Sequence, residues 1–187
     1  STCASLDILN LRLEIQDLLS FDSGDEVYDF ILCHGFFSWV DCETQEKTLG
    51  IFSKHLSENG LGYISYNTFP GWNFRKSIRE LLFIATEAGC DAQAQIEEAR
   101  KLLGILSESV GYDFERPFSL MMSSELKRIQ SESDSYLFHE FLEKENNPVF
   151  FRDFVGRLRE HGLEQVADAR LSRNELFRLD RASEVKG

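Results

Sequence analysis

Polar side chains with chemical uses follow three short apolar segments of this sequence. They are Asp17 and Leu18 after the first segment, Cys33, His34 and Gly35 after the second, and Tyr66 and Asn67 after the third. If the segments are strands of one open parallel sheet, these residues lie in a row at its carboxyl edge, where such sheets bind ligands. A carboxylate, an imidazole, a phenol and an amide beside aromatic rings suit a small-molecule site.

All three segments have strand patterns. Apolar residues alternate at Leu11, Leu13 and Ile15, which predicts a half-buried strand. Residues 27–33 are almost continuously apolar, as in a strand that is buried on both faces of a parallel sheet. Residues 61–66 form the third predicted strand.

A helix is predicted between the second and third strands. Asp41 suits its N-cap, Leu49, Phe52 and Leu56 recur at helical spacing, and Asn59-Gly60 ends it. A helix of this length makes the right-handed crossover that joins parallel strands. We therefore expect half of an open α/β sheet.

The sequence after Pro70-Gly71 is predominantly helical. Apolar stripes predict helices over 78–85, 96–110, 126–129, 136–142 and 151–158, the last ending at Gly162. Residues 163–171 have a pattern compatible with a further strand, and the tail 172–187 is charged and weakly patterned.

Composition limits the classes of partner. The 187 residues carry a formal net charge of −12, which argues against nucleic acid or an anionic membrane as the main partner and would attract a basic protein substrate. No apolar run approaches the length of a membrane helix, so no membrane insertion is expected. The four cysteines include no CxxC pair, so we expect free thiols, no metal and a cytoplasmic location.

Four segments carry a resemblance to a known family. Residues 28–39 and 61–72 resemble the fourth and fifth strand motifs of a bacterial group of class I S-adenosylmethionine (SAM)-dependent methyltransferases, and residues 136–143 and 148–155 are similar to the regulatory domain of that group. The group includes enzymes that methylate lysines on outer-membrane proteins. The resemblance implies SAM as the cofactor of the full-length protein and a protein side chain, such as lysine, as the acceptor.

The resemblance also implies roles for the residues of the row. Asp17 would approach the adenine amine and Leu18 would pack on the adenine face, while Cys33, His34 and Gly35 would lie under the methionine part of SAM. Phe36, Phe37 and Trp39 would wall the cleft. Tyr66 and Asn67 would lie where the acceptor amine arrives, and His34 would take its proton. The plainer alternatives are a turn residue for Asp17 and a hydrogen bond from His34 to a loop backbone.

One departure from the family pattern is large. The glycine-rich loop after the first strand and the acidic residue after the second are both missing, and residues 1–10 contain no glycine. We expect the missing part to lie upstream in the natural protein. The chain by itself is then expected to be inactive.

These observations predict an α/β fold, a partial Rossmann-like (class I methyltransferase) sheet followed by a mostly helical region. The expected parts are a partial methyltransferase core over 1–72, a helical regulatory region over 73–171 and a tail over 172–187. In one version, residues 73–148 are an insertion that covers the cleft, and the chain then rejoins the sheet near 163–171.

Two other functions stay open. The first is a non-catalytic regulatory or partner-binding module derived from a methyltransferase, and the weaker one is another Rossmann-like enzyme such as a reductase. The sequence does not determine the oligomeric state.

Overall fold

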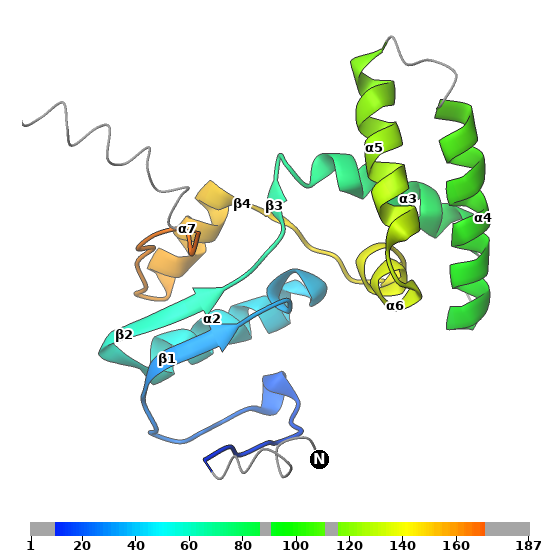
Figure 1. Ribbon diagram of the computed structural model, residues 1–187. Coiled ribbons are helices and arrows are strands. Elements are labelled where there is room, and N and C mark those ends of the chain that lie inside the picture. Colours follow the sequence, from blue (N-terminus) through cyan, green and yellow to red (C-terminus); the bar gives the residue numbers. More distant parts are fainter. Residues whose placement is uncertain (1–9, 87–90, 111–115, 171–187) are drawn as a thin grey trace, which may run out of the picture. The chain divides into compact units, whose positions relative to one another are not determined.

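The computed structural model describes residues 10–86, 91–110 and 116–170. The chain forms two compact units, one made of 1–66 with 152–187 and the other of 67–151 (Figure 1). The first unit is therefore built from two stretches that are far apart in the sequence.

A β-α-β segment forms the centre of the first unit. Strand β1 (Tyr28–Cys33) is followed by helix α2 (Cys42–His55) and strand β2 (Leu56–Ile64), and the two strands pair in parallel. Phe30 faces Leu61 and Cys33 faces Ile64 in the register. The predicted second strand, helix and third strand are confirmed in order and direction.

Local chemistry explains where α2 begins and ends. The side chain of Asp41 accepts a hydrogen bond from the Thr44 amide (2.8 Å), which satisfies one of the free donors of the first turn. The helix ends at His55, four residues before the predicted stop at Asn59-Gly60, because Leu56 takes extended backbone angles and enters β2. Pairing with β1 thus decides the boundary.

A close approach between α2 and β2 depends on a glycine. A Cβ atom at Gly62 would lie 2.6 Å from the ring of Phe52, which is itself buried. The strand can lie this close to the helix because residue 62 has no side chain.

The first predicted strand is wrong. Residues 11–17 have no regular structure and are exposed, so within the described residues the sheet of this unit has two strands rather than three. Alternation gives a segment one apolar face, but a strand also needs a neighbouring backbone to satisfy its amide and carbonyl groups. The described residues supply no such neighbour for 11–15.

Strand β1 is much less buried than its sequence predicts. Phe30 is 69% exposed and Leu32 75%, although the segment reads as buried on both faces. The described part of the chain packs against only part of this strand.

Helix α7 (Phe151–Glu160) brings the chain back to the first unit. Phe154 and Leu158 are buried, and Gly162 ends the helix with a φ of 71°, as predicted from the apolar stripe and the glycine. The predicted strand near 163–171 is wrong, because residues 163–170 have no regular structure. The chain returns through a helix, and residues 163–170 do not rejoin the sheet.

The second unit is a small helical bundle. It contains α3 (Asn73–Ala85), α4 (Ala92–Val110), α5 (Pro117–Ser131), α6 (Asp134–Leu137) and a π-helical turn at Phe138–Leu142. The short strands β3 (Thr68–Phe69) and β4 (Val149–Phe150) pair in parallel where the chain enters and leaves it. Within the described part of the chain, no helix has the length and apolar character needed to cross a membrane.

The helices surround one apolar core. Ile78 and Leu82 of α3 are fully buried, as the predicted stripe requires. The other core residues come from the remaining helices: Ile96, Ala99, Leu103, Met122, Leu126, Ile129, Leu137, Phe141 and Leu142.

Candidate functional site

The carboxyl ends of β1 and β2 are joined by two hydrogen bonds. The Ser65 amide donates to the Cys33 carbonyl (2.9 Å), and the Gly35 amide donates to the Ser65 hydroxyl (2.7 Å). Gly35 has a φ of 64°, which favours glycine, and nothing lies within 4 Å of where its Cβ would be. The structure thus brings the predicted group 33–35 beside Ser65, the residue before the predicted Tyr66, with open space beside Gly35.

His34 lies exposed at this edge. Its Nδ1 is 3.3 Å from the hydroxyl of Tyr63, and the two rings are stacked with centroids 5.9 Å apart. Tyr63 thus holds the imidazole from the neighbouring strand. An exposed, oriented imidazole has the chemistry of a general base.

Cys33 is half-buried, and burial raises the pKa of its thiol. The thiol therefore stays protonated at neutral pH, and the side chain acts as a small packing group. A nucleophilic cysteine needs the opposite shift.

Tyr66 is half-buried beside two other rings. Its ring lies against Phe154 with centroids 4.2 Å apart and meets the edge of Phe37 at 6.3 Å. Burial, and next the negative charge of Asp168, raise the pKa of the phenol to about 12. The hydroxyl therefore remains protonated at neutral pH and acts as a hydrogen-bond donor or acceptor rather than as a base.

Asp17 does not follow a strand. Its carboxylate accepts a hydrogen bond from the Leu19 amide (2.9 Å) and caps a short 3₁₀ helix at Leu18–Ser20, which packs against α2. The turn role that the sequence left open for Asp17 is thus present. Because residues 11–15 form no strand, the argument that placed Asp17 in the row does not hold, and its contact with adenine stays a prediction.

Asn67 begins the second unit. Its carbonyl accepts a hydrogen bond from the Val149 amide (3.1 Å), next to the β3–β4 pair. Its predicted place beside the acceptor amine is not tested by this geometry.

Phe37 is a core residue and does not wall a cleft. It is fully buried, with Phe154 at its edge (5.5 Å) and the Arg157 guanidinium 5.4 Å from its ring centroid. Phe36 is 36% exposed and Trp39 is half-buried. Aromatic composition alone did not distinguish a core ring from a cleft ring.

A polar network joins α7 to α2. Arg157 donates to Glu46 (2.7 Å) and to the Gln45 side chain (2.8 Å), and His161 Nε2 lies 2.8 Å from the same Glu46 carboxylate. The His161 hydrogen bond is the main cause that lowers the pKa of Glu46. This network fixes α7, and with it the Phe154 ring that supports Tyr66.

Three residues of this edge, Tyr63, Ser65 and Phe154, were not predicted as part of the site. Tyr63 and Ser65 alternate along the chain at the end of β2, which was a usable signal for one shared face. Phe154 comes from a stretch about ninety residues further along, and no local pattern links it to the sheet. Among residues 10–86, 91–110 and 116–170, no group of three acidic, histidine or cysteine side chains has the arrangement of a metal site.

Comparisons with known proteins show what the chain is similar to. A model described as "Predicted methyltransferase regulatory domain" matches residues 133–182. Protein RP028 of Rickettsia prowazekii is 34% identical over 82% of this chain. The structure of PKMT2 from Rickettsia typhi is 33% identical over 86% of the chain with a TM-score of 0.73, and its complex with AdoHcy matches 89% of the chain with a TM-score of 0.78.

The chain therefore carries a match to a methyltransferase regulatory domain and is similar over most of its length to a structure named PKMT2, in agreement with the resemblance of its motifs. The PKMT2 complex also confirms the cofactor expected of the group, since AdoHcy is what remains of SAM after the methyl group has left. The chain spans 61% of the length of RP028 and about a third of PKMT2, with 30% and 32% covered in the two structures.

Proposed function

We propose that this chain is the later part of a SAM-dependent methyltransferase that acts on lysine side chains of proteins. The observation that carries the proposal is the likeness to PKMT2 in complex with AdoHcy, at 33% identity over 89% of the chain. The likeness covers both the β-α-β segment and the helical unit.

The finer fold that we propose is a Rossmann-like sheet that continues beyond β1. The exposed apolar side chains of Phe30 and Leu32 support it, because strands of parallel sheets are normally covered on both faces. The length of the relatives leaves ample chain for further strands. The glycine-rich loop would lie in that additional part.

The residues at the carboxyl edge fit part of a SAM pocket. Gly35 leaves open space where a side chain would stand, and the Ser65 hydroxyl holds its amide in place. In this proposal Cys33, His34 and Gly35 lie under the methionine part of SAM, and Asp17 and Leu18 lie near the adenine. SAM supplies the electrophilic methyl group when it is bound.

The protein's own contribution is positioning and proton removal. Methyl transfer is an in-line displacement, so the acceptor must be held in line and protected from water. A lysine acceptor must also lose its proton, and the oriented, exposed imidazole of His34 is placed to accept it. The free thiols of Cys33 and Cys42 support a cytoplasmic location.

Calorimetric titration of SAM and AdoHcy tests the pocket. We expect negligible binding to this chain and clear binding to a version extended upstream to the length of its relatives. Equal, tight binding to both would show that the pocket is complete without the extension. No binding to the extended protein would favour the non-catalytic module instead.

Methylation of a lysine-containing protein substrate tests the mechanism. In the extended protein, His34→Gln is expected to lower kcat by about 10²-fold, the scale of a lost general base. His139→Gln, an exposed histidine on the π-helical turn, is the matched control and should leave kcat unchanged. Equal activity of the two variants would remove His34 from the mechanism.

A further inference from the structure

We propose that His55 is a positioning residue for cofactor binding: it anchors the segment 17–26 to α2 and so holds Asp17 and Leu18 where the adenine of SAM would lie. This inference rests on the proposed function and adds to it a residue that does not contact the ligand. His55 is the last residue of α2 and is only 2% exposed. A buried imidazole needs hydrogen-bond partners, and those of His55 lie in this segment.

The imidazole of His55 binds the end of the segment that leads into β1. Its Nδ1 lies 2.7 Å from the Glu26 carbonyl oxygen and 3.1 Å from the Ser23 hydroxyl, and its Nε2 lies 3.4 Å from the same hydroxyl. A carbonyl oxygen only accepts hydrogen bonds, so Nδ1 must carry a hydrogen and donate it. The structure therefore assigns one tautomer to the neutral ring of His55, with the hydrogen on Nδ1.

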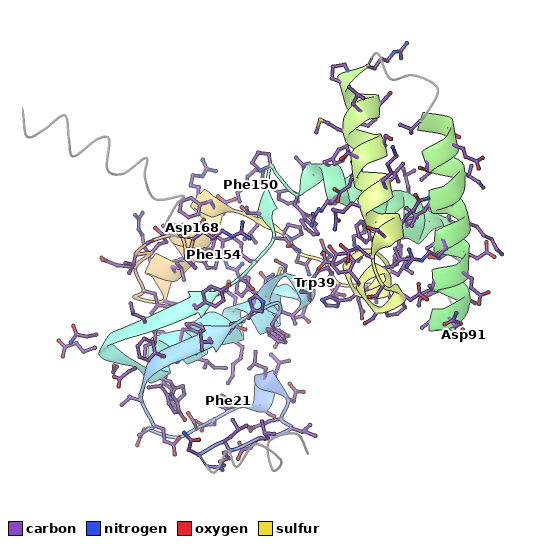
Figure 2. The ribbon with its side chains drawn as sticks, viewed as in Figure 1. Phe21, Trp39, Asp91, Phe150, Phe154 and Asp168 are labelled. Carbon is purple, nitrogen blue, oxygen red and sulfur yellow. The ribbon has the colours of Figure 1, made fainter. Side chains whose placement is uncertain are left out.

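Two further contacts join the middle of the segment to the end of α2. The edge of the half-buried Phe21 ring meets the His55 ring, with centroids 6.2 Å apart. Figure 2 shows Phe21 on the stretch between the 3₁₀ helix and β1. Lys54 donates a hydrogen bond to Asp22 (3.0 Å), but both side chains are more than half exposed, so this pair contributes little. His55 is therefore the main anchor of the segment on α2.

Short-range hydrogen bonds connect Phe21 to Asp17. The Phe21 amide donates to the Leu18 carbonyl (3.1 Å), and the Ser20 amide and hydroxyl donate to the Asp17 carbonyl (3.2 and 3.0 Å). The Leu19 amide donates to the Asp17 carboxylate (2.9 Å). Because these bonds join residues two or three positions apart, the stretch 17–21 is one tight turn. The contact between Phe21 and His55 therefore limits the positions that Asp17 and Leu18 can take.

The first experiment tests the anchor in this chain. NMR of the ring nitrogens of His55, assigned with His55→Phe, is expected to show the neutral ring with its hydrogen on Nδ1. His55→Phe keeps a ring beside Phe21 but removes the hydrogen bonds, so the Leu19 and Phe21 amides should exchange several-fold faster, the scale of one lost hydrogen bond. The matched control is Ser53→Ala, which removes a bond from α2 to the His161 carbonyl and should leave these rates unchanged. A neutral ring with its hydrogen on Nε2, or equal rates in both variants, would overturn the anchor.

The second experiment measures cofactor binding in the extended protein. His55→Phe is expected to raise the Kd for AdoHcy and the KM for SAM about tenfold, as when the segment is correctly placed for a tenth of the time. The kcat at saturating SAM and the KM for the lysine substrate should not change, because the segment serves the cofactor. His55→Asn should restore part of the affinity, since its amide nitrogen can donate from the place of Nδ1. In the unaltered protein, AdoHcy should slow hydrogen exchange of the Leu19 and Phe21 amides.

The possible failures are distinguishable. Binding of AdoHcy without slower exchange at Leu19 and Phe21, or an unchanged Kd in His55→Phe, would refute the positioning role and leave the proposed function standing. A loss shared equally by kcat and both KM values would show a general structural role and also refute it. No binding and no methylation by the unaltered extended protein would refute both. The tautomer and the protection by AdoHcy are measured without a substitution, so a variant that fails to fold leaves these two tests in place.

Discussion

The two units bury their apolar side chains to different extents. The helical unit encloses eleven core residues, several of them with no exposed surface. The β-α-β unit covers one side of its sheet with α2 but leaves Phe30 and Leu32 largely exposed. The helical unit thus buries its apolar faces within the described chain, whereas strand β1 has the composition of a strand that needs more neighbours.

The largest expected effect is in the helical core. Leu126→Ala removes a fully buried side chain of α5 and is expected to cost about 2–5 kcal/mol of unfolding free energy. Leu120→Ala, on the same helix but 51% exposed, should cost about 1 kcal/mol or less. The unfolding free energies of both variants are measured by urea unfolding, with hydrogen exchange of the α4 and α5 amides as the probe. Equal losses of unfolding free energy in the two variants would contradict a closed core in the helical unit.

A second effect depends on the length of the chain. Leu32→Ala should change the stability of this chain by about 0.5 kcal/mol or less, since the side chain is 75% exposed. In a version extended upstream, the same substitution is expected to cost about 2 kcal/mol or more, because the strand would then be covered. Denaturant unfolding of the unaltered protein and of Leu32→Ala, each in both lengths, measures the two changes in unfolding free energy. A small cost in both lengths would refute the continued sheet.

Gly62→Ala tests the contact between α2 and β2. The added Cβ would meet the Phe52 ring, so we expect a loss of about 1–3 kcal/mol, the usual cost of overpacking. The matched control is Gly50→Ala in α2, where nothing lies within 4 Å of the new atom and alanine favours the helix. Thermal unfolding of both variants is the measurement. A stable Gly62→Ala protein would show that the strand and helix separate easily.

The smallest effect concerns the α2–α7 network. The pKa of Glu46 is lowered in the folded protein, so its contribution is present above the ordinary glutamate pKa near 4.5 and is lost as pH falls below it. Because Glu46 is about half exposed, we expect less than about 1 kcal/mol. Glu46→Gln should remove this part of the pH dependence, as measured by urea unfolding at pH 7 and pH 4. An unchanged difference between the two pH values would exclude the contribution.

Sequence patterns predicted the elements that are set locally. The Asp41 cap, the apolar stripe of α3 and the glycine end of α7 appear as expected, because capping and helical periodicity depend on residues a few positions apart. The strands predicted at 11–15 and 163–171 failed for the opposite reason. A strand depends on a distant partner backbone, which a local pattern does not report.

The residues of the candidate site likewise include some whose placement could be predicted from the sequence and some whose placement could not. The approach of residues 33–35 to the residues that follow β2 was predictable, since the carboxyl ends of paired parallel strands share an edge. The placement of Asp17 was not, because it assumed a strand that does not form. The place of Asn67 beside the acceptor amine remains a prediction.

The sequence by itself determined the family motifs, the order of the main elements and the residue types at the ends of β1 and β2. Only the tertiary structure decided that α7 returns to the first unit, that Phe37 is buried and that Phe154 lies against Tyr66. The physical reason is separation along the chain. About ninety residues lie between Tyr66 and Phe154, and only the packing of α7 against the first unit brings them together.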